Sequence, residues 1–309
     1  MKKREVKEYV IGVDGGGTDT TVALADLEGN ILAKEETGPS SFMKVGIEEA
    51  VANIALSIKK VLKKGDVRST FIALAAVEEN PEMKKSIKEH LFEQKEINIV
   101  FSGKLKIGSD QIAGFRSGTD ERDGVVLISG TGSVAHAWKG EKEAHASGWG
   151  WVNDEGSAFW AGQKTFQAVF KEIDGRGEKT LITQMVFKEL KTQNPGEIKK
   201  RLYLEGNIIK NISQLSILTD KASQQGDKVA CDIIKKAANE LALSANTVIK
   251  RVGLKGQEFP VVLIGGMFKS SLLLEEVRRK VKKTAPRARF VRPTEDPVMG
   301  AVKLALENI

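Results

Sequence analysis

The stretch YVIGVDGGGTDTTVALA, residues 9–25, decides how the rest of the chain is interpreted. An apolar run ends at Asp14, three glycines follow, and a second β-branched run starts at Thr20. This pattern predicts two strands joined by a tight turn. Three glycines indicate a backbone that must stay bare, because a Cβ would block either a positive φ or the approach of an anion to the amides. Two interpretations stay open here: a phosphate-binding hairpin with Asp14 beside Mg²⁺, and an ordinary glycine-rich turn.

The same pattern returns later in the chain. Residues 124–138, GVVLISGTGSVAHAW, again predict a strand, a glycine-rich turn and a second strand. A third apolar strand, residues 261–264, ends in two glycines and runs into a helix instead. The repetition favours the phosphate-binding interpretation over an ordinary turn.

The order of these motifs resembles a known superfamily. GVDGGGTDT, LISGTGS and VVLIGGMFKS look like the two phosphate loops and the adenosine loop of the sugar kinases, actin and the heat-shock chaperones. DEGSAFWAG, residues 154–162, resembles the N-acetylglucosamine kinase branch of the BadF/BadG/BcrA/BcrD ATPase family. The resemblance runs from Tyr9 to about Ala305, and four motifs in a fixed order are more specific than any one of them.

The resemblance implies an α/β chain with a two-lobed, actin-like ATPase fold of the ribonuclease H-like type. We expect an N-terminal lobe over residues 1–119 and a C-terminal lobe over residues 120–309. Helical patterns fill most of residues 157–250 and predict a helical insertion in the second lobe. A closing helix over residues 297–307 contains Gly300-Ala301, which would let it cross another helix closely and pack back at the hinge.

The resemblance also implies where ATP and Mg²⁺ bind. There is no GxxxxGK[ST] sequence, so glycine turns would supply the amide donors to the phosphates. Asp14 would hold Mg²⁺, mostly through water. The nucleotide-binding residues implied are Gly15, Gly16, Gly17 and Thr18 in the first loop, Gly130, Thr131, Gly132 and Ser133 in the second, and Gly265, Gly266 and Lys269 in the third.

Asp110 is the implied catalytic base. Counting back from the second glycine turn places it where the family has an acidic residue that opens a helix, and it would take the proton from a sugar hydroxyl. From the residues alone, Ser109 or Asp110 would also suit a helix N-cap. The two roles are compatible.

A sugar site is predicted around residues 148–157, GWGWVNDEGS. Trp149 offers a flat apolar face to a sugar ring, and the carboxylates of Asp154 and Glu155 accept hydrogen bonds from hydroxyls. The alternative is a loop held to the core by its aromatic side chains. In the family, Ser41 lies in a second part of the sugar pocket, and Ala76-Val77 replaces a Ser-Gly-like pair that touches the sugar.

Composition bounds the remaining possibilities. The chain has 309 residues and a net charge of +7, and its lysines lie in short helical clusters interleaved with glutamate or followed by apolar residues, which favours solvated helix faces over a nucleic-acid site. No apolar run is long enough to cross a bilayer, and no signal peptide is evident, so we expect a cytoplasmic protein with no membrane partner. We also expect a homodimer.

Three functions remain open at this point. The first is an ATP-dependent hexose or hexosamine kinase acting on N-acetylglucosamine or glucosamine. The second is an ATPase that activates a dehydratase or reductase, although one cysteine, Cys231, is too few for the cysteine-held cluster of those relatives. The third is a nucleotide-binding regulatory protein without kinase activity.

Overall fold

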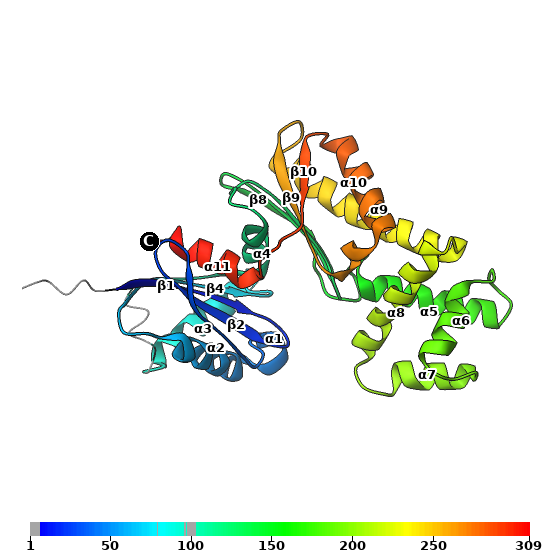
Figure 1. Cartoon of the computed structure of the whole chain (residues 1–309), viewed down its shortest axis with the longest axis horizontal. Helices are drawn as coiled ribbons and strands as arrows, with labels where there is room; N and C mark the ends of the chain where they lie inside the picture. Colours follow the sequence, from blue (N-terminus) through cyan, green and yellow to red (C-terminus); the bar gives the residue numbers. More distant parts are fainter. Residues whose placement is uncertain (1–6, 79, 96, 98–102) are drawn as a thin grey trace, which may run out of the picture. The chain divides into compact units, whose positions relative to one another are not determined.

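The structure is a computed structural model that describes residues 7–78, 80–95, 97 and 103–309. The chain divides into two compact units, shown in Figure 1. Unit 1 contains Met1–Glu121 and Pro293–Ile309, and unit 2 contains Arg122–Arg292. The apolar residues at 97–101 predict a further short strand, and of this segment only Ile97 lies within the described residues.

Unit 1 is a five-stranded sheet with helices on both faces. Its strand order is β3-β2-β1-β4-β5, with β1–β2 and β2–β3 antiparallel and β1–β4 and β4–β5 parallel. The strands are β1 (Glu8–Gly15), β2 (Thr20–Ala25), β3 (Ile31–Thr37), β4 (Asp66–Leu74) and β5 (Lys104–Ser109). The helices are α1 (Phe42–Val45), α2 (Ile47–Val61), α3 (Pro81–Glu93), α4 (Asp110–Gly118) and α11 (Pro297–Leu306).

The alternation of β1 distributes its side chains over two cores. Ile11 and Val13 are fully buried in the core beneath α2 and α3. Val10 points to the opposite face and is buried in the core formed with α4 and α11. Figure 1 shows α2 and α3 on one side of this sheet and α11 on the other. Helices on both faces fix the end of β1, where the first glycine turn begins.

Helix α11 lies unusually close to its neighbours in unit 1. A Cβ on Gly300 would stand 1.8 Å from the carbonyl oxygen of Ala113 in α4, and a Cβ on Gly12 of β1 would stand 2.5 Å from the backbone nitrogen of Val302. Both glycines are therefore required by packing. The close helix crossing predicted at Gly300 is confirmed.

Unit 2 repeats the sheet with a different helical cover. Its strand order is β10-β9-β6-β7-β8, with β6–β7 and β7–β8 antiparallel and β6–β9 and β9–β10 parallel. The strands are β6 (Gly124–Ser129), β7 (Ser133–Lys139), β8 (Lys142–Ser147), β9 (Phe259–Ile264) and β10 (Ala288–Val291). The helices are α5 (Ala158–Ile173), α6 (Leu181–Glu189), α7 (Pro195–Tyr203), α8 (Ile208–Gln224), α9 (Lys228–Val252), the 3₁₀ helix η2 (Gly266–Lys269) and α10 (Ser271–Thr284).

The long helix α9 joins the sheet of unit 2 to its helical insertion. One continuous core contains the inner face of β6, β7 and β9 together with side chains from α5, α6, α8, α9 and α10. Glycine again permits close packing, because a Cβ on Gly162 of α5 would stand 1.8 Å from the carbonyl oxygen of Ile212 in α8. The helices α5 to α8 form the group at the end of unit 2 in Figure 1. No helix in the part of the chain that the structure describes is long and apolar enough to cross a membrane.

Candidate functional site

The first glycine turn joins β1 to β2 as predicted. The backbone N–H of Gly16 donates to the carbonyl of Asp19 at 2.9 Å and closes the turn. None of Gly15, Gly16 and Gly17 has a positive φ, so a left-handed backbone is not the reason for the glycines. A Cβ on Gly15 would meet the Ser40 hydroxyl at 2.3 Å, whereas no atom lies within 4 Å of one on Gly17. The turn is therefore tightly packed where it leaves β1 and open at its tip.

The loop that follows β3 rests on this turn. The carbonyl oxygen of Gly16 accepts hydrogen bonds from the backbone N–H groups of Ser40 and Ser41, at 3.0 and 3.1 Å. The hydroxyl of Thr20 bridges Gly38 and Ser40. The structure thus brings Ser41, a predicted sugar residue, directly against the predicted phosphate loop. The sequence did not indicate Lys44 here, whose ammonium donates to the carbonyl of Gly17.

Asp14 lies at the end of β1 in a strongly acidic environment. Burial is the main cause that raises the pKa of its carboxyl from 3.8 to about 7. Neighbouring negative charges add to the rise, and they belong to Asp110, Asp19 and Asp296. Such a group holds its proton near neutral pH unless a positive charge compensates it. The sequence predicted Asp14 and Asp110, but it did not indicate Asp19 or Asp296.

Asp110 is the first residue of α4, and Ser109 is the N-cap. The Ser109 hydroxyl accepts from the backbone N–H of Gln111 at 3.0 Å, so the capping role falls to Ser109. Asp110 acts electrostatically on Asp14, which places the predicted base and the predicted metal ligand in the same part of unit 1.

The donor chemistry of this region fits Mg²⁺. Carboxylate oxygens are the hard ligands that Mg²⁺ prefers, and the buried Asp14 carboxyl lies within electrostatic reach of Asp110, Asp19 and Asp296. Among the described residues, no three His, Cys, Asp or Glu side chains are grouped closely enough to hold a metal by themselves. A metal here would be held by one or two carboxylates, water and substrate phosphate, as is usual for Mg²⁺.

The second glycine turn joins β6 to β7 in unit 2. The backbone N–H of Gly130 donates to the carbonyl of Gly132 at 2.9 Å, and the carbonyl of Gly130 accepts from the N–H of Ala158, the first residue of α5, at 2.8 Å. No atom lies within 4 Å of a Cβ built on Gly130. Ser133 turns away from the tip, because its hydroxyl donates to the carbonyl of Glu155 at 2.7 Å.

Asp154 holds the loop of residues 148–157 against this turn. Its buried carboxylate accepts from the backbone N–H groups of Ser133, Gly148 and Trp149, at 3.3, 3.0 and 2.9 Å. Three of about four lone-pair positions of the carboxylate are thereby used, which leaves one for a further donor. A Cβ on Gly132 would stand 2.5 Å from this carboxylate. Gly132 is therefore needed to let Asp154 approach the turn.

The rest of this loop is open. The Trp149 side chain is 67% exposed, and its ring meets that of His145 edge-on with centroids 5.5 Å apart. Trp151 instead packs edge-on against Phe159 of α5. Glu155 is exposed, and its carboxylate acts electrostatically on Glu240 of α9. Burial and this neighbouring carboxylate raise the pKa of Glu240 above its usual value.

The third predicted loop lies beside the second glycine turn. Gly265 has a φ of +110°, which favours glycine, and a Cβ there would stand 2.2 Å from the carbonyl oxygen of Ser129. Gly266 and Lys269 belong to η2 and are exposed. Unit 2 thus brings together its two predicted nucleotide loops, and Thr131 is exposed at the tip of the turn. In unit 1, Thr18 is exposed next to the tip glycine, Gly17.

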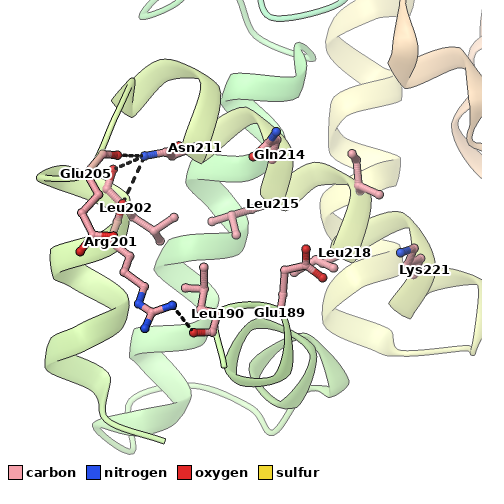
Figure 2. A pocket seen from close by; sticks show the side chains of 11 residues that line it. Glu189, Leu190, Arg201, Leu202, Glu205, Asn211, Gln214, Leu215, Leu218 and Lys221 are labelled. Atoms are coloured by element: carbon pink, nitrogen blue, oxygen red, sulfur yellow. Dashed lines mark hydrogen bonds between the residues drawn. The ribbon is translucent and has the colours of Figure 1, made fainter. Parts of the chain in front are cut away.

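A hollow of about 510 Å³ lies in the helical insertion, away from every predicted site residue. Figure 2 shows its lining on α6, α7 and α8. Within it, the Asn211 amide donates to the carbonyl of Glu205 at 2.6 Å, and Arg201 donates to the carbonyl of Leu190 at 2.6 Å. These polar groups tie helix ends together, which is a structural role.

Comparison with known proteins agrees with this arrangement. Two sheets of matching order, each with a glycine turn between its antiparallel strands, are the arrangement of the actin-like ATPase fold. The sequence pattern of the BadF/BadG/BcrA/BcrD ATPase family matches residues 11–305. The chain therefore belongs to this family, and membership implies the use of ATP.

Curated relatives match over nearly their full lengths. N-acetyl-D-glucosamine kinase of Dictyostelium discoideum is 32% identical over 321 aligned positions, which cover 98% of this chain and 99% of the relative. N-acetylmuramic acid/N-acetylglucosamine kinase of Clostridium acetobutylicum is 28% identical, with 96% and 98% covered.

A solved structure confirms the predicted fold. A putative N-acetylglucosamine kinase from Chromobacterium violaceum superimposes with a TM-score of 0.72 at 22% identity, covering 97% of this chain and 99% of that one.

Proposed function

We propose that the protein is an ATP-dependent kinase that transfers the γ-phosphate of ATP to a hydroxyl of a hexosamine, N-acetylglucosamine or glucosamine. The observation that carries the proposal is the full-length relationship to two curated N-acetylglucosamine kinases. A dehydratase activator is less well supported, because the single cysteine, Cys231, lies within α9.

Asp110 is the proposed catalytic base. It accepts the proton of the attacking sugar hydroxyl as that oxygen forms a bond to the γ-phosphorus, while the bond from the γ-phosphorus to the bridging oxygen breaks and ADP leaves. Its position in unit 1 beside Asp14 supports this role. The proposed acceptor hydroxyl is O6.

The glycine turns supply the phosphate contacts in this proposal. The open space at Gly17 and Gly130 leaves the tips of both turns free for phosphate oxygens to approach. Asp14 is the proposed Mg²⁺ ligand, and the ion would neutralise charge on the phosphates. The third loop, with Gly265, Gly266 and Lys269, is proposed to hold the adenosine.

The sugar is proposed to contact Ser41, Trp149 and Glu155. Trp149 has the exposure that stacking on a sugar ring requires. Asp154 can offer its remaining lone pair to a sugar hydroxyl while its three backbone hydrogen bonds hold the loop. A cytoplasmic location and a homodimeric assembly complete the proposal.

A sugar panel with ATP and Mg²⁺ tests the function. We expect ADP release well above the rate with water alone for at least one of N-acetylglucosamine, glucosamine, N-acetylmuramic acid, glucose and mannose. Phosphorus NMR of the product then identifies the esterified hydroxyl. If no sugar raises ADP release in a folded, ATP-binding preparation, the protein is not a sugar kinase.

A further inference from the structure

A second cavity in unit 2, of about 730 Å³, lies between α5 and α9. Each helix lines it with residues spaced i, i+3, i+4 and i+7, which belong to one helical face. The lining residues of the two helices are Lys164, Gln167, Ala168 and Lys171 of α5 and Val229, Asp232, Ile233 and Lys236 of α9. The volume falls in the range of small-molecule sites.

Three lysines in this cavity form no ion pair in the part of the chain that the structure describes. They are Lys164, Lys171 and Lys236. Lys164 lies over the Trp160 ring at 5.4 Å from its centroid, and Lys171 acts electrostatically on the exposed Asp174. These lysines therefore give the cavity positive charge from both of its helical walls.

The two acidic residues of the lining, Glu178 and Asp232, interact with Lys228 outside the cavity. Glu178 forms a salt bridge of 3.0 Å with Lys228, which does not line the cavity. Glu178 and, more weakly, Asp232 raise the pKa of Lys228. Lys228 therefore compensates part of the negative charge of Glu178 and Asp232. The charge that remains in the cavity comes from the lysines and is positive.

A glycine loop bounds one end of the cavity. The N–H of Gly177 donates to the carbonyl of Lys171 at 2.9 Å, and a Cβ on Gly177 would stand 2.8 Å from the Cβ of Lys171. Arg176, also in the lining, is held to Asp174 by a salt bridge of 2.6 Å. The loop thus lies directly on the last turn of α5.

Both helical walls lead to the loop beneath the second glycine turn. The N–H of Ala158, which begins α5, donates to the carbonyl of Gly130. In α9, the carbonyl of Ala237 lies so close to Gly156 that a Cβ there would stand 2.8 Å from it. The start of α5 is therefore bonded to the turn proposed to hold phosphate, and α9 packs on the loop that follows at Gly156.

We propose that the cavity between α5 and α9 binds the phosphate ester of a small metabolite, and that its occupancy adjusts the second glycine turn. Lysine ammonium groups are common phosphate ligands, and three of them suit a dianionic phosphate. A sugar phosphate and a nucleotide share this chemistry, and the experiment distinguishes them. The regulatory part rests on the proposed kinase function, whereas the binding part does not.

Calorimetric titration of the full chain without turnover tests the binding. The probes are glucosamine 6-phosphate, ADP and inorganic phosphate, each added to wild type and to the double variant Lys171→Met, Lys236→Met. We expect saturable millimolar or tighter binding of one ester, weakened about tenfold for each lysine removed, as loss of a charged hydrogen bond implies. Lys199→Met on α7 is the matched control and should bind as wild type does.

The outcomes separate the cavity from the nucleotide loops. An ester that binds only at the glycine turns gives the same titration in wild type and in the double variant, and that result overturns the proposal. The absence of saturable binding by any ester also overturns it. The charge-preserving pair Lys171→Arg, Lys236→Arg should retain binding, which guards against an effect of misfolding. With a working sugar assay, the bound ester should shift KM for ATP more in wild type than in the double variant, where only competition at the glycine turns remains.

Discussion

At the scale of single residues, the carboxylate of Asp110 carries the chemical hypothesis. Because Ser109 supplies the N-cap of α4, Asp110→Asn preserves the cap and removes only the base. We expect sugar phosphorylation to fall by about 10²–10⁴-fold, the range of general-base catalysis, with nucleotide affinity changed only a few-fold. Steady-state rates and ADP calorimetry measure the two effects.

The exposed Asp66→Asn at the start of β4 is the matched control, because it also removes one carboxylate from unit 1. Its turnover should equal that of wild type. Near wild-type turnover in Asp110→Asn would show that Asp110 is not the base.

The glycines of the second turn separate phosphate binding from packing. A side chain at Gly130 meets no atom, whereas one at Gly132 meets the Asp154 carboxylate at 2.5 Å. We expect Gly130→Val to weaken ADP binding at least tenfold with little change in the melting temperature, and Gly132→Val to lower the melting temperature clearly. Calorimetry and thermal unfolding on both variants provide the measurements. Unchanged ADP affinity in folded Gly130→Val would show that this turn does not hold phosphate.

The acidic residues around Asp14 show which site residues can be predicted from the sequence and which cannot. Asp14 is marked by its place before the glycines, and Asp110 by its distance from the next turn. Asp296 also acts electrostatically on Asp14, but no motif in the sequence connects the two residues.

 The two residues stand 282 positions apart in the sequence, and only the packing of α11 against β1 brings them into the same environment. Contacts of this kind depend on tertiary structure, so the residue pattern around Asp296 gives no signal for them.

At the scale of elements, hydrophobic periodicity predicted most helices and strands, including the complete helical insertion. It did not indicate β5, because the charged Lys104 and Lys106 alternate with only two apolar residues in that short strand. It also predicts one helix from about Lys44 to Lys63, whereas the structure has α1 and α2, which Gly46 separates with a φ of +82°. The pairing of β5 with β4 and the backbone angle of Gly46 determine these two boundaries, and a short local pattern of apolar residues does not show either of them.

The contact of α9 with the predicted sugar loop should depend on pH. Glu240 binds its proton more tightly in the folded state, mainly through burial and secondly through the charge of Glu155. Below pH 4.5, the usual pKa of a glutamate, Glu240 is protonated in both the folded and the unfolded protein and does not oppose folding. As the pH rises through the raised pKa of Glu240, the folded protein loses stability relative to the unfolded one. We expect Glu240→Gln to melt above wild type at neutral pH and to match it near pH 4.5.

Thermal unfolding of both proteins across this pH range checks the prediction. Glu275→Gln on the exposed face of α10 is the matched control, and it should follow the wild-type curve at every pH. A Glu240→Gln variant whose melting temperature runs parallel to that of wild type would show that folding does not raise the pKa of Glu240.

At the scale of the whole molecule, the residues proposed to contact the sugar come from both units of the chain. Ser41 and Ala76 belong to unit 1, and Trp149 and Glu155 belong to unit 2. Ala76 has a φ of +58°, so the backbone takes a left-handed turn without a glycine. Val77 is fully buried in the core beneath α2 and α3 and is not available to a ligand. The resemblance to the family implies that Ala76, an apolar residue, stands where relatives have a Ser-Gly-like contact to the sugar.

This replacement predicts a kinase that is tolerant of the sugar 2-substituent. A site built to hydrogen-bond a group rejects analogues that lack it, whereas an apolar site discriminates by only about 1–3 kcal/mol. We expect glucosamine, or several hexoses, to be phosphorylated with kcat/KM values comparable with or above that of N-acetylglucosamine. Steady-state kinetics on the four sugars N-acetylglucosamine, glucosamine, glucose and mannose measure this, and Ala76→Ser is the matched variant that should shift preference toward N-acetylglucosamine. A wild-type kcat/KM for N-acetylglucosamine about a hundredfold above the other three would contradict the prediction, because that ratio requires specific recognition of the 2-substituent.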